Sequence, residues 1–244
     1  MEQRRWLEED GYCLDLYQGE IPVRGVGLMT VQDCKPGQWT RAFAHGVELL
    51  RQQGAQMILA SSPLEGSPLR GKTAQVGPLR FVYRHTLDLL ILDIQKDRWG
   101  PCDSLIHEPL SRDNAEEFIR LYNDAMDLVP NVTTYTMEDL PQLMSLRQMA
   151  QLYRLPDGTP AAVTEVQLGM DRPLLETLAV AEDYRGRGLG RAALGDTLCR
   201  LYRGGYWGVA LIVSNANPTA YRFYLSQGFQ KYRAYSHWYE FQGE

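Results

Sequence analysis

One segment, LAVAEDYRGRGLGRAAL at residues 178–194, constrains this chain more than any other. An apolar strand there runs directly into a glycine-rich turn, and a helix starts behind the turn. Gly186, Gly188 and Gly190 let successive backbone N–H groups converge on an anion, with the positive end of the helix dipole behind them. The sequence therefore predicts a phosphate site that is built mainly from backbone.

Two better-known glycine loops do not fit this turn. A Walker loop needs Gly-Lys-Ser/Thr, whereas Gly190 is followed by Arg191 and Ala192. A dinucleotide fingerprint also fails, because the three glycines alternate with other residues and no strand with a terminal acidic residue follows at the usual distance. The spacing that fits is Arg/Gln-x-x-Gly-x-Gly/Ala, which is met by Arg185, Gly188 and Gly190.

A second motif follows one helix later, in VALIVSNANPTAYRFYLSQGF. Its pattern is Asn-x-x-Ala-x-x-x-Tyr-x-x-x-Gly-Phe, and the matching residues are Asn217, Ala220, Tyr224, Gly228 and Phe229. The first motif resembles the acetyl-CoA pyrophosphate loop of the GNAT acetyltransferases, and the second resembles the next motif of that family. The resemblance covers about residues 105–241, the C-terminal half of the chain.

Periodicity and turn residues outline this half. Asp113 or Asn114 can cap a helix that ends at Met126, and a short helix follows Met137. The other expected elements are a hairpin at 149–168 around the Pro156-Asp157-Gly158 turn, a strand at 174–180, a helix at 190–203, a strand at 209–213, a helix at 218–227 and a hairpin at 229–241. This order resembles a GNAT domain. The expected fold class is α/β (α+β), with a central mixed, splayed sheet flanked by helices.

The N-terminal half carries a degenerate copy of the pattern. At an offset of 150 positions, Leu28, Asp33, Lys35, Arg41 and Ala42 align with Leu178, Asp183, Arg185, Arg191 and Ala192. Gln38 and Thr40 stand where the C-terminal copy has glycines, which adds Cβ atoms where a phosphate would approach the backbone. We therefore expect a tandem arrangement, with a smaller degenerate GNAT-like domain at residues 1–102 and the GNAT acetyltransferase domain at 103–244.

The resemblance also implies how acetyl-CoA is held. Pantetheine would lie in a gap of the sheet, bonded to the backbone of Leu178 and Val180, and a free N–H near Ala179 would face the thioester oxygen. The turn would hold the diphosphate. The cofactor-binding residues implied in this way are Leu178, Ala179, Val180, Arg185, Gly186, Arg187, Gly188, Leu189, Gly190, Arg191, Asn217 and Tyr224.

Two residues are candidates for proton transfer. The motif selects Tyr224 as general acid, because a phenol with a pKa of about 10 can donate a proton to a departing thiolate. The alternative is an aromatic residue that only packs. Glu176 is the candidate base, and strand alternation puts it on the face of Leu178; the alternative is a solvated carboxylate. The remaining candidates for the base are Glu165, Glu138 and Asp139.

Net charge, apolar runs and cysteine spacing limit the classes of partner that this chain can have. A net charge of -5 without a lysine/arginine run argues against nucleic acid or an anionic membrane. No apolar run approaches membrane-spanning length, so we expect a cytoplasmic protein. The cysteines lack CxxC spacing, and no metal is expected. The aromatic strand at 235–241 could pair with another chain, as in a homodimer, or with the N-terminal half.

The function that this sequence implies is an acyl-CoA-dependent N-acetyltransferase. It would transfer an acetyl group from acetyl-CoA to a primary amine of a small molecule or a protein N-terminus by direct attack. The alternative is a non-catalytic acyl-CoA sensor or partner-binding module that retains the GNAT fold. The acceptor cannot be read from the sequence, because specificity in this family lies in loops that vary freely.

Overall fold

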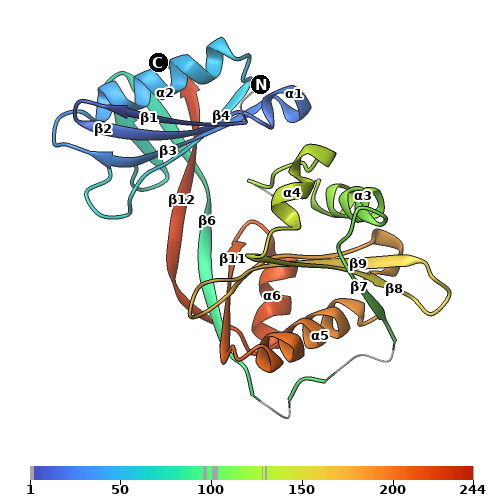
Figure 1. Ribbon diagram of the computed structural model, residues 1–244. Coiled ribbons are helices and arrows are strands. Elements are labelled where there is room, and N and C mark those ends of the chain that lie inside the picture. Colours follow the sequence, from blue (N-terminus) through green and yellow to red (C-terminus); the bar gives the residue numbers. More distant parts are fainter. Residues whose placement is uncertain (1–2, 96–97, 101–103, 128, 130, 244) are drawn as a thin grey trace. The chain divides into compact units, whose positions relative to one another are not determined.

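The computed structural model describes residues 3–95, 98–100, 104–127, 129 and 131–243 (Figure 1). The chain divides into two compact units. Unit 1 contains Met1–Asp88, Ser214–Ala216 and Ala234–Glu244, and unit 2 contains Leu89–Val213 and Asn217–Arg233. The boundary expected between residues 102 and 103 lies outside the described residues.

Unit 1 is built on a mixed sheet. Its elements are β1 (Arg4–Glu9), β2 (Tyr12–Tyr17), α1 (Ile21–Arg24), β3 (Val26–Cys34), α2 (Trp39–Gln52), β4 (Met57–Ser61), β5 (Thr73–Val76), the first part of β6 (Leu79–Asp93) and the last part of β12 (Gln230–Gly243). The strand order is β1-β2-β3-β4-β12-β6, and β5 pairs with β6. β3 and β4 run parallel, whereas β1, β2 and β3 are antiparallel neighbours.

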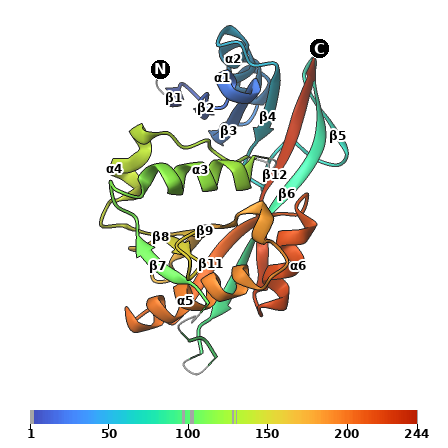
Figure 2. The ribbon, with the colours of Figure 1, turned by 90° about the vertical axis from the view of Figure 1, so that its right-hand side faces the viewer.

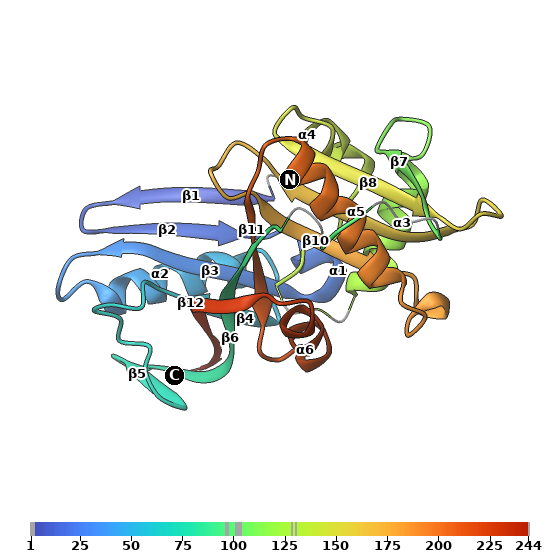
Figure 3. The same cartoon turned by 90° about the horizontal axis from the view of Figure 1, so that it is seen from below.

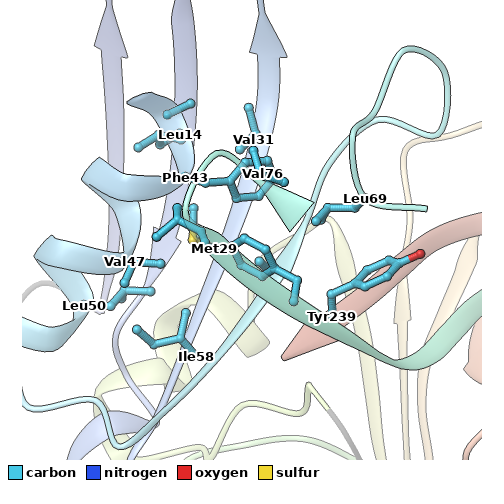
Figure 4. Packing of buried hydrophobic residues seen from close by; sticks show 14 of the residues in the cluster. Leu14, Met29, Val31, Phe43, Val47, Leu50, Ile58, Leu69, Val76 and Tyr239 are labelled. Atoms are coloured by element: carbon cyan, nitrogen blue, oxygen red, sulfur yellow. The ribbon is translucent and has the colours of Figure 1, made fainter. Parts of the chain in front are cut away.

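The core of unit 1 lies between α2 and this sheet. Phe43, Val47 and Leu50 recur at helical spacing and form the buried stripe of α2. They pack in one cluster with Leu14 and Met29 of the sheet (Figure 4). The amphipathic pattern of α2 therefore fixes which face of the sheet the helix covers.

Unit 2 contains the sheet that the two motifs predict. Its elements are the last part of β6, β7 (Ile106–Pro109), α3 (Ala115–Met126), η1 (Met137–Asp139), α4 (Leu140–Leu143), β8 (Gln148–Arg154), β9 (Pro160–Gln167), β10 (Leu174–Val180), η2 (Glu182–Tyr184), α5 (Leu189–Arg203), β11 (Gly208–Ser214), α6 (Pro218–Ser226) and the start of β12. The strand order is β6-β11-β10-β9-β8-β7. β10 and β11 are parallel, and β7, β8, β9 and β10 are antiparallel neighbours.

Helices cover both faces of the unit 2 sheet. Leu152 of β8 packs with Phe118 of α3, whereas the next residue, Tyr153, packs with Leu189 and Ala193 of α5. Successive residues of a strand point to opposite faces, so α3 and α5 lie on opposite sides of the sheet. Figure 2 shows them on either side of β8 and β9.

The expected elements of the C-terminal half are confirmed with one exception. Asn114 precedes α3, Met137 begins η1, and β8 to α6 lie where the periodicity predicted them. The hairpin expected at 229–241 is wrong, because β12 is one continuous strand. Residues 230–241 contain no Gly, Pro, Asn or Asp to make a turn, and β12 pairs with its neighbours instead of folding back.

An offset of 150 or 151 positions recurs in the elements themselves. α2 begins at Trp39 and α5 at Leu189; β4 begins at Met57 and β11 at Gly208. In both units a strand, a helix and a second strand parallel to the first follow one another. The N-terminal half thus repeats the chain path of the C-terminal half, as its sequence predicted.

Two long strands are shared between the units. β6 contributes residues up to Asp88 to unit 1 and residues from Leu89 onward to unit 2. β12 contributes residues up to Arg233 to unit 2, and its remainder completes unit 1. In the sheet of unit 1, β12 lies between β4 and β6. The aromatic strand at 235–241 therefore pairs within its own chain.

Within the described part of the chain, none of the helices combines the length and the apolar character needed to cross a bilayer.

Because the last residues of the chain lie in the core of unit 1, we expect that core to depend on them. Tyr239 is 3% exposed and lies opposite Ala60, and its hydroxyl donates to the Gly71 carbonyl at 3.1 Å. Tyr239→Ala should lower the free energy of unfolding by about 3–5 kcal/mol, measured by urea denaturation. Tyr235→Ala is the matched control in the same strand, where the residue is 47% exposed, and should change it by less than about 0.5 kcal/mol. Equal effects would contradict the assignment of β12 to this core.

Candidate functional site

The glycine turn connects β10 to α5. Gly188 is the residue that caps α5, with a left-handed φ of 81°, and Gly186 has a φ of 75°. A Cβ at either position would meet no atom within 4 Å, so glycine is required there by the backbone conformation and the space beside it is open. The first N–H groups of α5 have no acceptor within the helix and point out of its end. An anion fits beside these N–H groups, and we call the turn at residues 186–191 the glycine cradle.

The third glycine of the turn has different surroundings. Gly190 lies in the first turn of α5, where a Cβ would lie 3.5 Å from Val180 Cγ2 and 3.7 Å from Phe223 Cζ. Both distances are ordinary van der Waals contacts, so a small side chain would fit here. Gly190 therefore lies where α5 meets β10 and α6, and neither its space nor its backbone conformation requires a glycine.

The arginines of the turn have partners inside the protein. Arg185 donates from Nε to the Val180 carbonyl at 3.1 Å and from Nη2 to the Ala125 carbonyl at 3.4 Å. The guanidinium of Arg187 lies 5.3 Å from the centre of the Tyr184 ring. Arg191 is exposed in the first turn of α5. The three arginines give the turn a positive charge, and Arg185 also ties it to β10.

β10 and β11 pair over a short distance only. In the described chain their parallel ladder joins Leu174 to Ala210 and Leu175 to Leu211. Beyond it, Leu178, Ala179 and Val180 pair with β9 on the other side. The edge of β10 that faces β11 is therefore left without a strand partner, and its backbone groups are available to an extended ligand.

The second motif forms the start of α6. Asn217 is the N-cap residue, and its Oδ1 accepts from the Ala220 N–H at 3.1 Å. Tyr224 lies two turns further on and contacts Phe223 and Phe229 edge-to-face, with ring centres 5.3 and 5.6 Å away. Desolvation raises the pKa of Tyr224, so its hydroxyl keeps its proton at neutral pH.

Glu176 occupies a β-bulge. On β10, Leu175 lies opposite Val166 and Thr177 lies opposite Glu165, so Glu176 is an extra residue between the two pairs. Simple alternation put Glu176 on the face of Leu178, and this expectation is wrong because the bulge interrupts the alternation. The Glu176 side chain instead lies close enough to Glu165 for the two carboxyl groups to interact, and Thr177 Oγ1 donates to Glu165 Oε2 at 3.4 Å.

The two glutamates form an acidic pair at different depths. Glu165 is 2% exposed, and Glu176 is exposed. Burial, followed by the negative charge of Glu176, raises the pKa of Glu165 to about 7. Desolvation of its carboxyl group by neighbouring residues also raises the pKa of Glu176. Two carboxyl groups this close titrate as a coupled pair, and each ionises less readily than an isolated carboxyl group.

Polar neighbours orient this acidic pair. The Tyr135 hydroxyl donates to Glu165 Oε2 at 3.0 Å, and Gln148 Nε2 donates to Glu176 Oε2 at 3.2 Å. The other amide atom, Gln148 Oε1, is buried and has no hydrogen-bond partner among the described residues. An unused acceptor beside two carboxyl groups fits a ligand that brings several N–H donors.

A contact that sequence reasoning missed holds Tyr135 in place. Asn123 on α3 donates from Nδ2 to the Tyr135 carbonyl and accepts the Tyr135 N–H at Oδ1, both at 2.9 Å. The Tyr135 ring stacks on Tyr122 with centres 4.1 Å apart. Asn123 lies among helical residues, and no sequence pattern marks it as a partner of a loop 12 residues later.

The other two acidic candidates lie elsewhere. Asp139 Oδ2 accepts from the Thr136 N–H at 2.7 Å and completes the capping box of η1. Glu138 is exposed beside it. Their side chains belong to a helix start and not to the acidic pair.

Comparison with known proteins agrees with this geometry. Residues 156–231 match the family model described as "Acetyltransferase (GNAT) domain". A GCN5-related N-acetyltransferase from Sphaerobacter thermophilus has a similar structure, with a TM-score of 0.67 and 14% identity over 96% of this chain and 76% of that one. No curated protein sequence matches this chain.

Two further solved structures are similar along nearly the whole chain. A GCN5-related N-acetyltransferase from Kribbella flavida has a TM-score of 0.59 and 15% identity, over 99% of this chain and 91% of that one. A tandem GNAT protein from the clavulanic acid biosynthesis pathway has a TM-score of 0.58 and 17% identity, over 95% of this chain and 78% of that one. The segment that matches the GNAT domain model contains both motifs, and the chain as a whole has a fold of the GNAT type.

Proposed function

We propose that this protein is a cytoplasmic N-acetyltransferase that transfers an acetyl group from acetyl-CoA to a primary amine of a small molecule or a protein N-terminus. The observation that carries the proposal is the open glycine cradle at the start of α5, beside the unpaired edge of β10. Acyl-CoA has a diphosphate anion that suits the helix end and an extended pantetheine chain that suits the strand edge.

The residues present fit acetyl-CoA, which would supply an activated acetyl group as a thioester. The backbone amides of residues 186–191 would hold the diphosphate, with positive charge from Arg185, Arg187 and Arg191. The unpaired backbone edge of Leu178, Ala179 and Val180 would align the pantetheine. Asn217, at the start of α6, is the further contact that the second motif implies.

The acidic pair supports an amine as acceptor. An ammonium group brings three N–H donors, and Glu176, Glu165 and the unpartnered Gln148 Oε1 are acceptors within one cluster. Glu176 is exposed and would meet the acceptor first. Glu165 has a pKa of about 7, close to the value at which a general base works best at neutral pH. We assign removal of the amine proton to this pair, with Glu176 as the residue at the surface.

Tyr224 is assigned as general acid. Its raised pKa keeps the phenol protonated, which is the form that can donate to a departing thiolate. Edge-to-face contacts with Phe223 and Phe229 hold the ring in place.

The N-terminal unit is proposed to be a degenerate copy that does not hold a phosphate at the equivalent position. Gln38 stands at the start of α2 in place of Gly188 and has a right-handed backbone. The turn at Gly77 approaches so closely that a Cβ there would lie 2.4 Å from Thr40 Cγ2. The start of α2 thus has Gln38 in place of a left-handed glycine and a turn packed against Thr40, whereas the space beside Gly186 and Gly188 is open.

Substitution in the cradle tests acyl-CoA binding. Gly188→Ala adds a Cβ at a φ of 81°, which strains the turn and moves the amides that would face the diphosphate. We expect the dissociation constant for acetyl-CoA, measured by calorimetry, to rise at least about tenfold, or by about 1.4 kcal/mol.

Gly158→Ala is the matched control for this prediction. Gly158 has a φ of 88° and equally open surroundings in the hairpin between β8 and β9. The Gly158→Ala variant should lose about as much stability as Gly188→Ala and keep the wild-type affinity for acetyl-CoA. Equal affinities of wild type and Gly188→Ala would contradict the cradle.

Replacing Tyr224 with phenylalanine removes one hydroxyl group and tests whether Tyr224 is the general acid. With the most reactive acceptor from a panel of primary amines, Tyr224→Phe should lower kcat about 10²-fold, measured as release of free thiol. Calorimetric affinity for acetyl-CoA should change by less than about twofold, because the ring remains. Tyr221→Phe, in the same helix, is the control. Full turnover by Tyr224→Phe would rule out this role, and binding without transfer to any amine would favour the acyl-CoA sensor.

The acidic pair predicts a pH dependence of stability that needs no acceptor. Because the folded state raises the pKa of Glu165, its protonated form stabilises the fold below about pH 4.5, and this contribution is lost as the pH rises through about 7. Glu165→Gln should remove a decrease of about 1–3 kcal/mol in the free energy of unfolding between pH 5 and 8, measured by urea denaturation.

Two further variants separate the causes of this shift. Glu176→Gln removes the neighbouring charge and lowers the folded-state pKa of Glu165, so the decrease should end at a lower pH and become smaller. Glu138→Gln, at an exposed site outside the pair, should leave the profile unchanged. A wild-type profile that Glu165→Gln does not alter would show that Glu165 has an ordinary pKa.

A further inference from the structure

The first strand of the chain lies at an open edge of the unit 1 sheet. β1 pairs with β2 on one side, and among the described residues no strand pairs with its other side. Figure 3 shows β1, β2 and β3 side by side, with β1 outermost. Apart from Leu7, every residue of β1 is exposed, including Trp6 at 58%. An exposed edge of this kind is a template for another strand.

The backbone pattern shows which residues offer hydrogen bonds at this edge. Gln18 N–H donates to the Gln3 carbonyl at 2.7 Å, so the odd-numbered residues of β1 face β2. The N–H and C=O groups of Arg4, Trp6 and Glu8 therefore point to the open side. These three side chains also share one face of the sheet.

The sequence of β1 is complementary to itself when reversed. It reads RRWLEE, with two arginines at one end and two glutamates at the other. Charged side chains on an edge strand ordinarily discourage pairing with another strand. Here an antiparallel second copy instead brings each basic end to an acidic end.

We propose that β1 binds β1 of a second copy of this chain, antiparallel and around a two-fold axis at Trp6. A two-fold axis perpendicular to the sheet pairs residues of the same face, and centring it on Trp6 places Trp6 opposite the partner's Trp6. Arg4 then lies opposite the partner's Glu8, and Glu8 opposite the partner's Arg4. All three positions have their backbone groups on the open side, so the register satisfies hydrogen bonds and charges together.

Reversing the charge of two β1 residues tests whether β1 forms the dimer interface. Wild type should sediment as a dimer, and Glu8→Arg/Glu9→Arg should raise the dimer dissociation constant at least about tenfold, measured by analytical ultracentrifugation. Glu65→Arg/Glu116→Arg makes the same change in net charge at exposed positions outside β1 and should leave the dimer intact. A monomeric wild type, or a dimer that Glu8→Arg/Glu9→Arg does not weaken, would overturn the proposal.

Two further variants check the pairing itself. The double variant Arg4→Glu/Arg5→Glu should not dimerise by itself, because its strand ends are all acidic. It should form heterodimers with the double variant Glu8→Arg/Glu9→Arg, whose strand ends are all basic. Because Arg4 also pairs with Asp15, a second test avoids that position. Trp6→Cys places two sulfurs across the axis, where directly opposed Cα atoms are about 5.5 Å apart, within disulfide range.

Mild oxidation should therefore link Trp6→Cys into a covalent dimer on a non-reducing gel. Wild type and Leu7→Cys, whose position faces the partner's Arg5 in this register, are the controls. Linking of Leu7→Cys in preference to Trp6→Cys, or of neither, would overturn the register.

Discussion

The early separation of β10 from β11 is the constraint on which the candidate site depends. The two strands are joined at Leu174 and Leu175 only, and the bulge at Glu176 follows at once. A bulge increases local twist and re-aims side chains. It turns one edge of β10 away from its parallel neighbour and brings Glu176 to Glu165. The edge left for an extended ligand and the acidic pair therefore have the same origin in the backbone.

The acidic pair lowers the stability of the fold, and its raised pKa values suit proton transfer. Two neighbouring carboxyl groups, one of them buried, cannot both ionise readily, and the pKa of each is raised. The Tyr135 hydroxyl keeps Glu165 oriented, and Asn123 fixes the loop that carries Tyr135. Destabilised groups of this kind concentrate at functional sites. Glu165, a secondary candidate by sequence, is thus better placed for proton transfer than an isolated surface carboxylate.

The two units follow the same chain path but differ at the start of the equivalent helices. Both contain a strand, a helix and a parallel strand at an offset of about 150 positions. In unit 2 the helix begins at a left-handed glycine with open space beside it. In unit 1 it begins at Gln38, and the Gly77 turn packs against Thr40. The dipole of a helix end alone does not make a site, because the backbone must also be accessible.

The sequence by itself determined the local features: the glycine turn, the Asn217 cap, the order of elements in the C-terminal half and the offset that marks the repeat. These depend on backbone conformation and on periodicity within a few residues. Only the tertiary structure decided that β12 is one strand shared by two units, that Glu176 sits in a bulge, and that Asn123 holds Tyr135 against Glu165. Each of these results from pairing between distant segments, where register and burial, and not local propensity, determine which side chains meet.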